Sequence, residues 1–142
     1  MRIARASRHA RYMKTNPRIV VVGGGFAGLE SAFLLRAKLG EKADITVVSD
    51  RDSFLFKPNT IYIPFGGKLE SLLIPLAKPM AKRNIRFIQG AVGELDPIAQ
   101  RVTVADWGIP YDYLVLATGA DMRPDEVPGL ADHAETIWTP SA

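Results

Sequence analysis

Six residues near the start of the chain, Gly-Gly-Gly-Phe-Ala-Gly at positions 23–28, fit the pattern G-x-G-x-x-G. The chemistry that this spacing serves is the binding of a pyrophosphate. Gly23 permits a tight turn, Gly25 lets the backbone approach the phosphates, and Gly28 lets a helix pack closely on a strand. The free amides and the dipole at the start of that helix then hold the negative charge.

The pattern is informative because regular elements flank it on both sides. Residues 18–22 are a β-branched apolar run, which predicts a buried parallel strand. Residues 26–39 carry apolar side chains at helical spacing, and Gly40 favours a helix end there. Residues 44–48 predict a second buried strand. Strand, glycine turn, helix and strand in this order predict a right-handed crossover and a dinucleotide-binding unit.

In such units an acid that binds the ribose hydroxyls is expected about 20 residues after the glycines, at the end of the second strand. Ser49 follows the apolar run directly, and Asp50 stands one residue later. A serine hydroxyl can also hydrogen-bond a ribose, so both residues are candidates. The alternative for Asp50 is a solvated acid that opens a turn.

Less regular structure follows the second strand. Residues 54–67 are apolar but broken by prolines, whereas residues 69–82 predict a helix interrupted at Pro75 and Pro79. Residues 85–89 predict a third strand of the parallel sheet.

Turn signals divide the next stretch into short strands. Residues 91–95, 101–104 and 109–111 predict a three-stranded antiparallel meander. Residues 113–117 predict another buried strand, which ends at Thr118 and Gly119.

Charge is distributed unevenly along the chain. The net charge is +3, but residues 1–18 hold six basic residues and no acid, which leaves 12 basic against 15 acidic residues in the body. The basic character therefore belongs to a disordered arm, residues 1–17, and does not indicate a nucleic-acid-binding face. Three interpretations of the arm stay open. It fits a transit peptide, or a basic tail that contacts anionic lipid or nucleic acid. Alternatively, it has no function of its own, and Met13 is the natural first residue.

Several other kinds of site are excluded by composition. The chain has no cysteine, so it holds no disulfide, thiolate metal site or dithiol redox centre. His9 and His133 are its two histidines, and neither has a metal-ligand partner at useful spacing. No run of about 18 apolar residues that could span a bilayer occurs.

A second motif, Leu-Val-Leu-Ala-Thr-Gly at positions 114–119, follows the predicted meander. Together with the glycine pattern it resembles the two-dinucleotide-binding-domain flavoproteins, the pyridine nucleotide-disulfide oxidoreductase superfamily. Residues 45–50 and 54–59 are most similar to sulfide:quinone oxidoreductases and type II NADH:quinone oxidoreductases. Ser49 and the Glu-Val-Pro-Gly segment at 126–129 favour the sulfide branch. The resemblance covers residues 18–140.

This resemblance implies an α/β fold, a Rossmann-like FAD-binding domain with a parallel sheet and an antiparallel meander. It also implies that FAD is the cofactor and assigns residues to it. Those residues are Gly23, Gly25, Phe26, Ala27 and Gly28 at the pyrophosphate, Ser49 and Asp50 at the ribose, Lys57 and Pro58 at the flavin, Val92 at the adenine, and Ala117, Thr118 and Gly119 at the closing turn. The alternatives are a surface lysine for Lys57 and an ordinary strand residue for Val92.

The implied activity is electron transfer from sulfide or NAD(P)H to a quinone, in a cytoplasmic enzyme peripheral on the inner face of a membrane. The resemblance implies that the membrane contact is made through a C-terminal region that is missing from this chain. Sulfide-oxidising members use a pair of cysteines, which this chain lacks. We expect residues 18–142 to be the N-terminal part of the FAD domain, incomplete and inactive alone, ending at the crossing to a second nucleotide-binding domain. A non-catalytic nucleotide-binding module and the NAD-binding half of a dehydrogenase are the competing interpretations.

Overall fold

The computed structural model describes residues 16–134, so the predictions made for residues 1–15 and 135–142 lie outside the described residues. Its centre is a parallel sheet in the order β5-β2-β1-β9. These strands are β1 (Arg18–Val22), β2 (Asp44–Ser49), β5 (Arg86–Gln89) and β9 (Tyr113–Leu116). Helix α1 (Phe26–Leu39) crosses from β1 to β2. The predicted βαβ unit is therefore confirmed.

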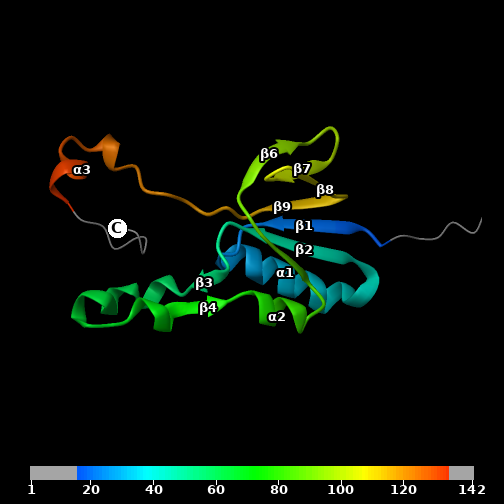
Figure 1. Cartoon of the computed structure of the whole chain (residues 1–142), viewed down its shortest axis with the longest axis horizontal. Helices are drawn as coiled ribbons and strands as arrows, with labels where there is room; N and C mark the ends of the chain where they lie inside the picture. The colour runs from blue at the N-terminus through cyan, green and yellow to red at the C-terminus, as the bar shows by residue number, and fades with distance from the viewer. Residues whose placement is uncertain (1–15, 135–142) are drawn as a thin grey trace, which may run out of the picture.

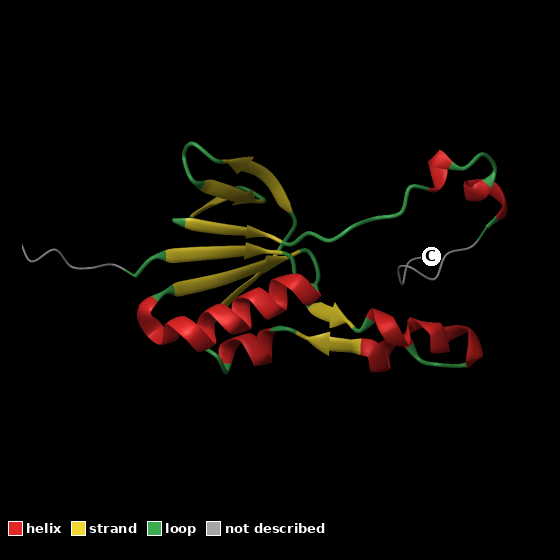
Figure 2. Cartoon of the chain, turned by 180° about the vertical axis from the view of Figure 1, so that it is seen from behind, coloured by secondary structure: helices red, strands yellow, loops and turns green. Residues whose placement is uncertain are grey.

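Two layers cover the sheet, one on each face (Figure 1). Helices α1 and α2 (Ala77–Ala81) lie on one face. The meander of β6 (Val92–Asp96), β7 (Arg101–Val104) and β8 (Trp107–Pro110) lies on the other. Figure 2 shows the same arrangement from behind. The predicted α/β architecture with a meander is confirmed.

Strand β1 supplies side chains to both cores, which explains its unbroken apolar run. Ile19 and Val21 belong to the core under α1 and α2, whereas Val20 and Val22 belong to the core under the meander. All four side chains are at most 5% exposed. A strand buried on both faces has no reason to alternate polar and apolar residues.

The helix predicted over residues 69–82 is wrong in its first half. That half is a 3₁₀ helix, Leu69–Leu72, followed by strand β4 (Leu73–Pro75). Strand β4 pairs antiparallel with β3 (Ser53–Leu55). Pro75 has no amide proton and stands at the end of the pairing, where none is required.

Strands β3 and β4, with the 3₁₀ helix Lys57–Phe65 between them, project from the body of the molecule. We call residues 53–75 the extension.

The third meander strand begins earlier than predicted. Trp107 and Gly108 pair with Val104 and Thr103, so β8 starts at Trp107 and not at Ile109. Only two residues, Ala105 and Asp106, remain for the turn. Ala105 has a φ of 50°, which is the left-handed conformation that a tight hairpin needs.

The remaining described elements follow short turns. The 3₁₀ helix Gly40–Lys42 ends α1, and the 3₁₀ helix Pro124–Glu126 and helix α3 (Leu130–His133) come after β9.

An ion pair joins Arg18, the first residue of β1, to Asp112, which directly precedes the neighbouring strand β9. The Arg18 guanidinium donates to both carboxylate oxygens of Asp112, over 2.8 and 3.1 Å, and the Arg18 amide donates over 2.7 Å. Hydrogen bonds from the Arg18 guanidinium, and to a lesser extent from the Arg18 amide, hold the pKa of the Asp112 carboxyl at about 2, below its ordinary value of 3.8.

This pair predicts a specific pH dependence of stability. A carboxyl whose pKa is lowered by folding stabilises the folded state above its ordinary pKa, and this contribution is lost as the pH falls from about 4 to about 2. We expect Asp112→Asn to lower the melting temperature at pH 7, with the difference from wild type shrinking toward pH 2. Calorimetric melting temperatures of both proteins from pH 7 to pH 2 measure this. A difference that stays constant over that range contradicts it.

Candidate functional site: an open glycine turn at the sheet edge

The glycine turn lies where three parallel strands end. The Gly23 amide donates to the Val48 carbonyl at the end of β2, over 2.8 Å. The Ala117 amide donates to the Val22 carbonyl, also over 2.8 Å. The turn after β1 is therefore held between the carboxyl ends of β2 and β9, the edge at which ligands bind in open α/β sheets.

Two of the predicted glycines are required by close packing. Gly23 has a φ of +117°, and a Cβ there would lie 2.1 Å from the Ala117 carbonyl oxygen. A Cβ on Gly28 would lie 2.0 Å from the Gly23 carbonyl oxygen. The glycine turn thus packs against Ala117, directly after β9, and the first turn of α1 packs against the glycine turn.

Gly25 differs from both, because a Cβ there would meet no heavy atom within 4 Å. It is the N-cap of α1, no side chain caps the helix, and the first turn contains no acid. The first helical hydrogen bond runs from the Leu29 amide to the Gly25 carbonyl. The amides of Phe26 and Ala27 precede it and have no acceptor in a preceding turn. This open, uncapped helix start fits the phosphates of a dinucleotide.

The two ribose candidates have different surroundings. Ser49 is 5% exposed, and its hydroxyl accepts a hydrogen bond from the Arg51 amide over 3.3 Å. Its side chain also faces Gly24, where an added Cβ would lie 2.6 Å from the Ser49 hydroxyl. The Asp50 carboxylate is 68% exposed and lies 3.9 Å from the Arg51 guanidinium. Asp50, not Ser49, therefore exposes its side chain to solvent.

An aromatic cluster connects the glycine turn to the extension. Phe26 makes an edge-to-face contact with Phe54 at 4.7 Å between ring centroids, and Phe56 lies 5.8 Å from Phe26. Lys57 and Pro58 come directly after Phe56 and begin a 3₁₀ helix. The cluster thus brings the first residues of that helix toward the start of α1.

The other predicted residues lie around the same edge. Thr118 follows Ala117 directly beneath the turn, and its amide is 3.3 Å from the Cβ position of Gly23. Gly119 has a φ of +83° and open space around it. Val92 is half-buried, packs on the core beneath the meander and pairs with Val104 of β7.

Sequence reasoning missed the aromatic cluster and the role of Gly24. The signal for the cluster was Phe54 and Phe56 on either side of Leu55, which is a two-residue period. Gly24 occupies a free position of the motif, yet a Cβ there would meet both Ser49 and Leu76. Nothing in the sequence alone points to that contact.

In the part of the chain that the structure describes, no helix combines the length and apolar character needed to cross a bilayer.

Comparison with known proteins decides the family. Residues 15–140 match the family model described as pyridine nucleotide-disulphide oxidoreductase. The chain belongs to this family. Its members and the relatives below are FAD-dependent oxidoreductases, which gives FAD as the cofactor of the chain.

Two curated relatives illustrate the range. The sulfide-quinone reductase of Aquifex aeolicus is 42% identical over 103 residues, covering 71% of this chain and 24% of that protein. A type II NADH:quinone oxidoreductase of Staphylococcus haemolyticus is 27% identical over 123 residues, covering 84% of this chain and 30% of that protein. The chain spans about a quarter of the length of these relatives.

Solved structures agree with this assignment to the family. The sulfide:quinone oxidoreductase of Aquifex aeolicus superposes with a TM-score of 0.80 at 36% identity, over 88% of this chain and 29% of that one. An NAD-dependent persulfide reductase from A. fulgidus superposes with a TM-score of 0.73 at 27% identity, over 87% of this chain and 26% of that one. Both likenesses favour a flavoprotein over a stand-alone nucleotide-binding module.

Proposed function

We propose that this chain is the FAD-binding part of a flavin-dependent oxidoreductase that passes electrons from sulfide or NAD(P)H to a quinone. The observation that carries the proposal is the open, uncapped start of α1 at Gly25, held between the ends of β2 and β9. The names of the relatives, one a sulfide-quinone reductase and one a type II NADH:quinone oxidoreductase, support the two donors and the acceptor.

At the adenosine half of the cofactor, the glycine turn binds the pyrophosphate, and residues at the strand ends bind the ribose and the adenine. Gly25 leaves room for the pyrophosphate, and the amides of Phe26 and Ala27 donate to it. Asp50 accepts from the ribose hydroxyls, while the buried Ser49 hydroxyl holds the turn that places Asp50. The backbone of Val92 faces the adenine.

At the flavin half, the extension supplies the contacts. Lys57 and Pro58 lie beside the ring, positioned by the aromatic cluster, and Thr118 and Gly119 close the site from β9. FAD, when bound, supplies the redox chemistry by accepting electrons from the donor and passing them to the acceptor. The positive charge of Lys57 favours the uptake of electrons on that side.

The stronger of the two similarities is to the sulfide-quinone reductase, at 42% against 27% identity. Sulfide is therefore the first donor to test, and NADH the second. A quinone acceptor also places the protein at a membrane surface, and we propose that it is peripheral on the inner, cytoplasmic face.

The cofactor can be tested on the purified chain. Flavin released by denaturation is expected to be FAD and not FMN, and calorimetric titration is expected to show binding of FAD in preference to NAD. Binding of NAD without FAD would favour the dehydrogenase interpretation, and binding of adenine nucleotides alone would favour a non-catalytic module.

The donor is tested in the protein that carries this chain. With FAD bound and oxygen excluded, sulfide is expected to bleach the flavin absorbance, and a water-soluble quinone is expected to restore it. Bleaching by NADH alone would assign the NADH branch. A flavin that neither donor reduces would contradict the proposed activity.

A further inference from the structure

The glycine turn and the first residue of α1 contact both ends of the extension. Phe26 packs edge to face on Phe54 of β3, with 4.7 Å between the ring centroids, and the Phe56 ring lies 5.8 Å away. At the other end of the extension, an added Cβ on Gly24 would lie 2.9 Å from a methyl carbon of Leu76, which directly follows β4. The turn that serves the phosphates therefore also supports the base of the extension.

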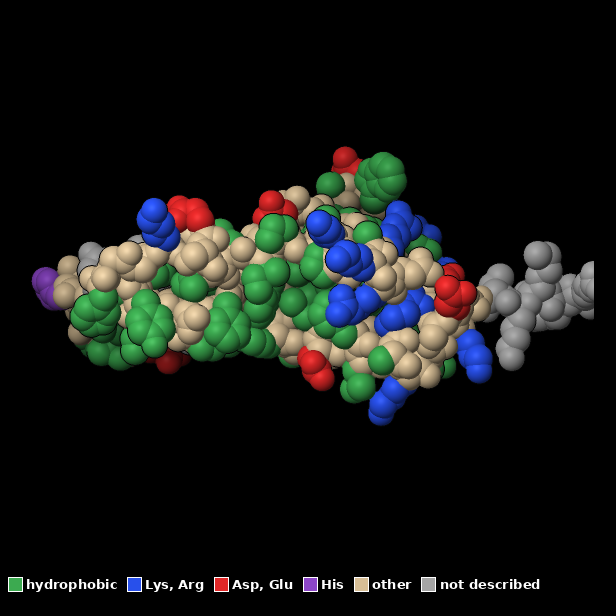
Figure 3. All heavy atoms as spheres, turned by 90° about the horizontal axis from the view of Figure 1, so that it is seen from below, with side chains coloured by type: hydrophobic (Ala, Val, Ile, Leu, Met, Phe, Trp, Pro, Cys, Tyr) green, Lys and Arg blue, Asp and Glu red, His purple; other side chains and the backbone are tan. Residues whose placement is uncertain are grey.

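The extension depends on this support, because its own hydrogen bonds do not attach it to the parallel sheet. Strands β3 and β4 pair with each other in a separate two-stranded sheet. The Leu76 amide donates to the Asp52 carbonyl over 2.9 Å, which joins one side of the hairpin to the other. Seen from below, apolar side chains run along the extension and onto the body (Figure 3). The direction of the extension relative to the sheet therefore depends on side-chain packing at its base.

Three aromatic rings make this packing directional. Phe54 and Phe56 are two residues apart, with 6.4 Å between their ring centroids, and both lie against Phe26. Edge-to-face pairs are favoured because the positive edge of one ring meets the negative face of the other. Phe54 also packs against the core under α1 and α2. Because Lys57 and Pro58 follow Phe56 directly, the Phe26 ring helps to fix where their 3₁₀ helix begins.

We propose that Phe26 is a positioning residue that couples the two halves of the cofactor site. Its backbone amide serves the pyrophosphate, and its ring holds the residues that approach the flavin. The ring acts through Phe54 and Phe56 and not by contact with the cofactor. Without the ring, binding of the flavin half must itself hold the extension in place, which lowers the affinity. The inference deepens the proposed function and rests on it.

Two ligands test this coupling in the flavin-free form of the protein that carries this chain. ADP contains the adenosine and both phosphates, whereas FAD contains the flavin half as well. Phe26→Leu keeps an apolar side chain and the backbone amide but removes the ring, so calorimetric titration is expected to show FAD binding weakened about fivefold or more and ADP binding weakened less than about twofold. Phe26→Tyr keeps the ring, and Phe26 is 52% exposed, so this variant should bind FAD as the wild type does.

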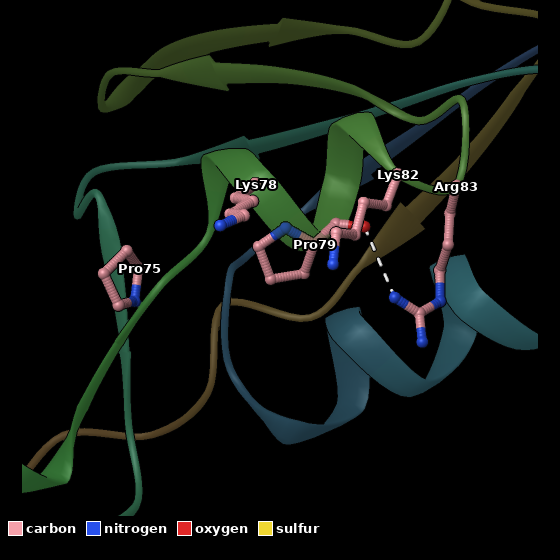
Figure 4. A pocket seen from close by; sticks show the side chains of 5 residues that line it. All are labelled: Pro75, Lys78, Pro79, Lys82 and Arg83. Carbon is pink, nitrogen blue, oxygen red and sulfur yellow. Dashed lines mark hydrogen bonds between the residues drawn. The ribbon is translucent and has the colours of Figure 1, made fainter.

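Phe33→Leu is the matched control on the same helix. The Phe33 ring is not one of the three rings of the cluster, and it lies 4.6 Å from the Arg83 guanidinium, which extends from the end of α2 toward α1 (Figure 4). Its loss is expected to lower the melting temperature but to change neither affinity more than about twofold. Melting temperatures of all variants separate a loss of stability from a loss of FAD affinity.

A double-mutant cycle tests whether Phe26 acts through Phe54. Phe54→Leu alone should weaken FAD binding about fivefold, and the double variant should also lose about fivefold and not the product of about 25-fold, because both substitutions break one contact. Unchanged FAD affinity in Phe26→Leu, equal losses for FAD and ADP, or multiplied losses in the double variant would each overturn the inference and leave the proposed function intact. Failure of the wild-type protein to bind FAD would overturn the proposed function and the inference with it.

Discussion

Gly25→Val is expected to leave the fold intact and to abolish FAD binding. A Cβ at this position meets no heavy atom within 4 Å, and the φ of −86° suits any residue. A valine side chain would, however, occupy the space in front of the Phe26 and Ala27 amides. Hydrogen bonds to a charged group are worth about 1.5–3 kcal/mol each, so losing two of them lowers the affinity about 100-fold or more.

Two measurements separate binding from folding in this variant. Urea denaturation should show a free energy of unfolding lowered by no more than about 1 kcal/mol, the usual cost of a poor N-cap residue. Flavin absorbance of the purified protein should be lost, and Gly25→Ala should show a smaller loss. Full flavin content in the valine variant would remove Gly25 from the pyrophosphate site.

Gly23→Ala is expected to have the opposite result, a large loss of stability. The added Cβ would lie 2.1 Å from the Ala117 carbonyl oxygen, and the φ of +117° is strained for any residue with a side chain. Backbone strain costs about 1–3 kcal/mol and overpacking about 1–3 kcal/mol, so the free energy of unfolding should fall by about 3–5 kcal/mol.

Gly40→Ala is the matched control. Gly40 also has a positive φ, +57°, but a Cβ there meets nothing within 4 Å. Its substitution should cost only the conformational strain, about 1–3 kcal/mol, without the cost of overpacking. Denaturant unfolding of both variants measures the difference, and equal losses would show that the contact with Ala117 is unimportant.

The sequence predicted those elements whose pattern is local. The runs that became β1 and β2 are largely apolar because both faces of the sheet are covered, and α1 begins at the glycine turn and ends at Gly40 as its spacing indicates. The hairpin of β3 and β4 was not predicted. Each of its strands has three residues, too few to show a period, and its partners are about 20 residues apart.

At the candidate site, composition indicated which residues are present but not which way they face. In the sequence, Ser49 and Asp50 are equally good candidates for binding the ribose. In the structure, the Ser49 hydroxyl is buried against Gly24, whereas the Asp50 carboxylate is exposed. The same holds for Phe26, whose contact with Phe54 depends on a chain reversal between them. Such contacts between segments have no signature in one sequence.

Strand β1 is shared by both cores, and the glycine turn is its direct continuation. Each layer covers alternate side chains of this one strand, so the loss of either layer would expose part of β1, which makes the strand part of the most protected cooperative unit. A loop anchored to such a unit has few conformations to lose when a ligand arrives. The ordering entropy of the phosphate-binding turn is thus lost during folding, before any cofactor is present, and binding is preorganised.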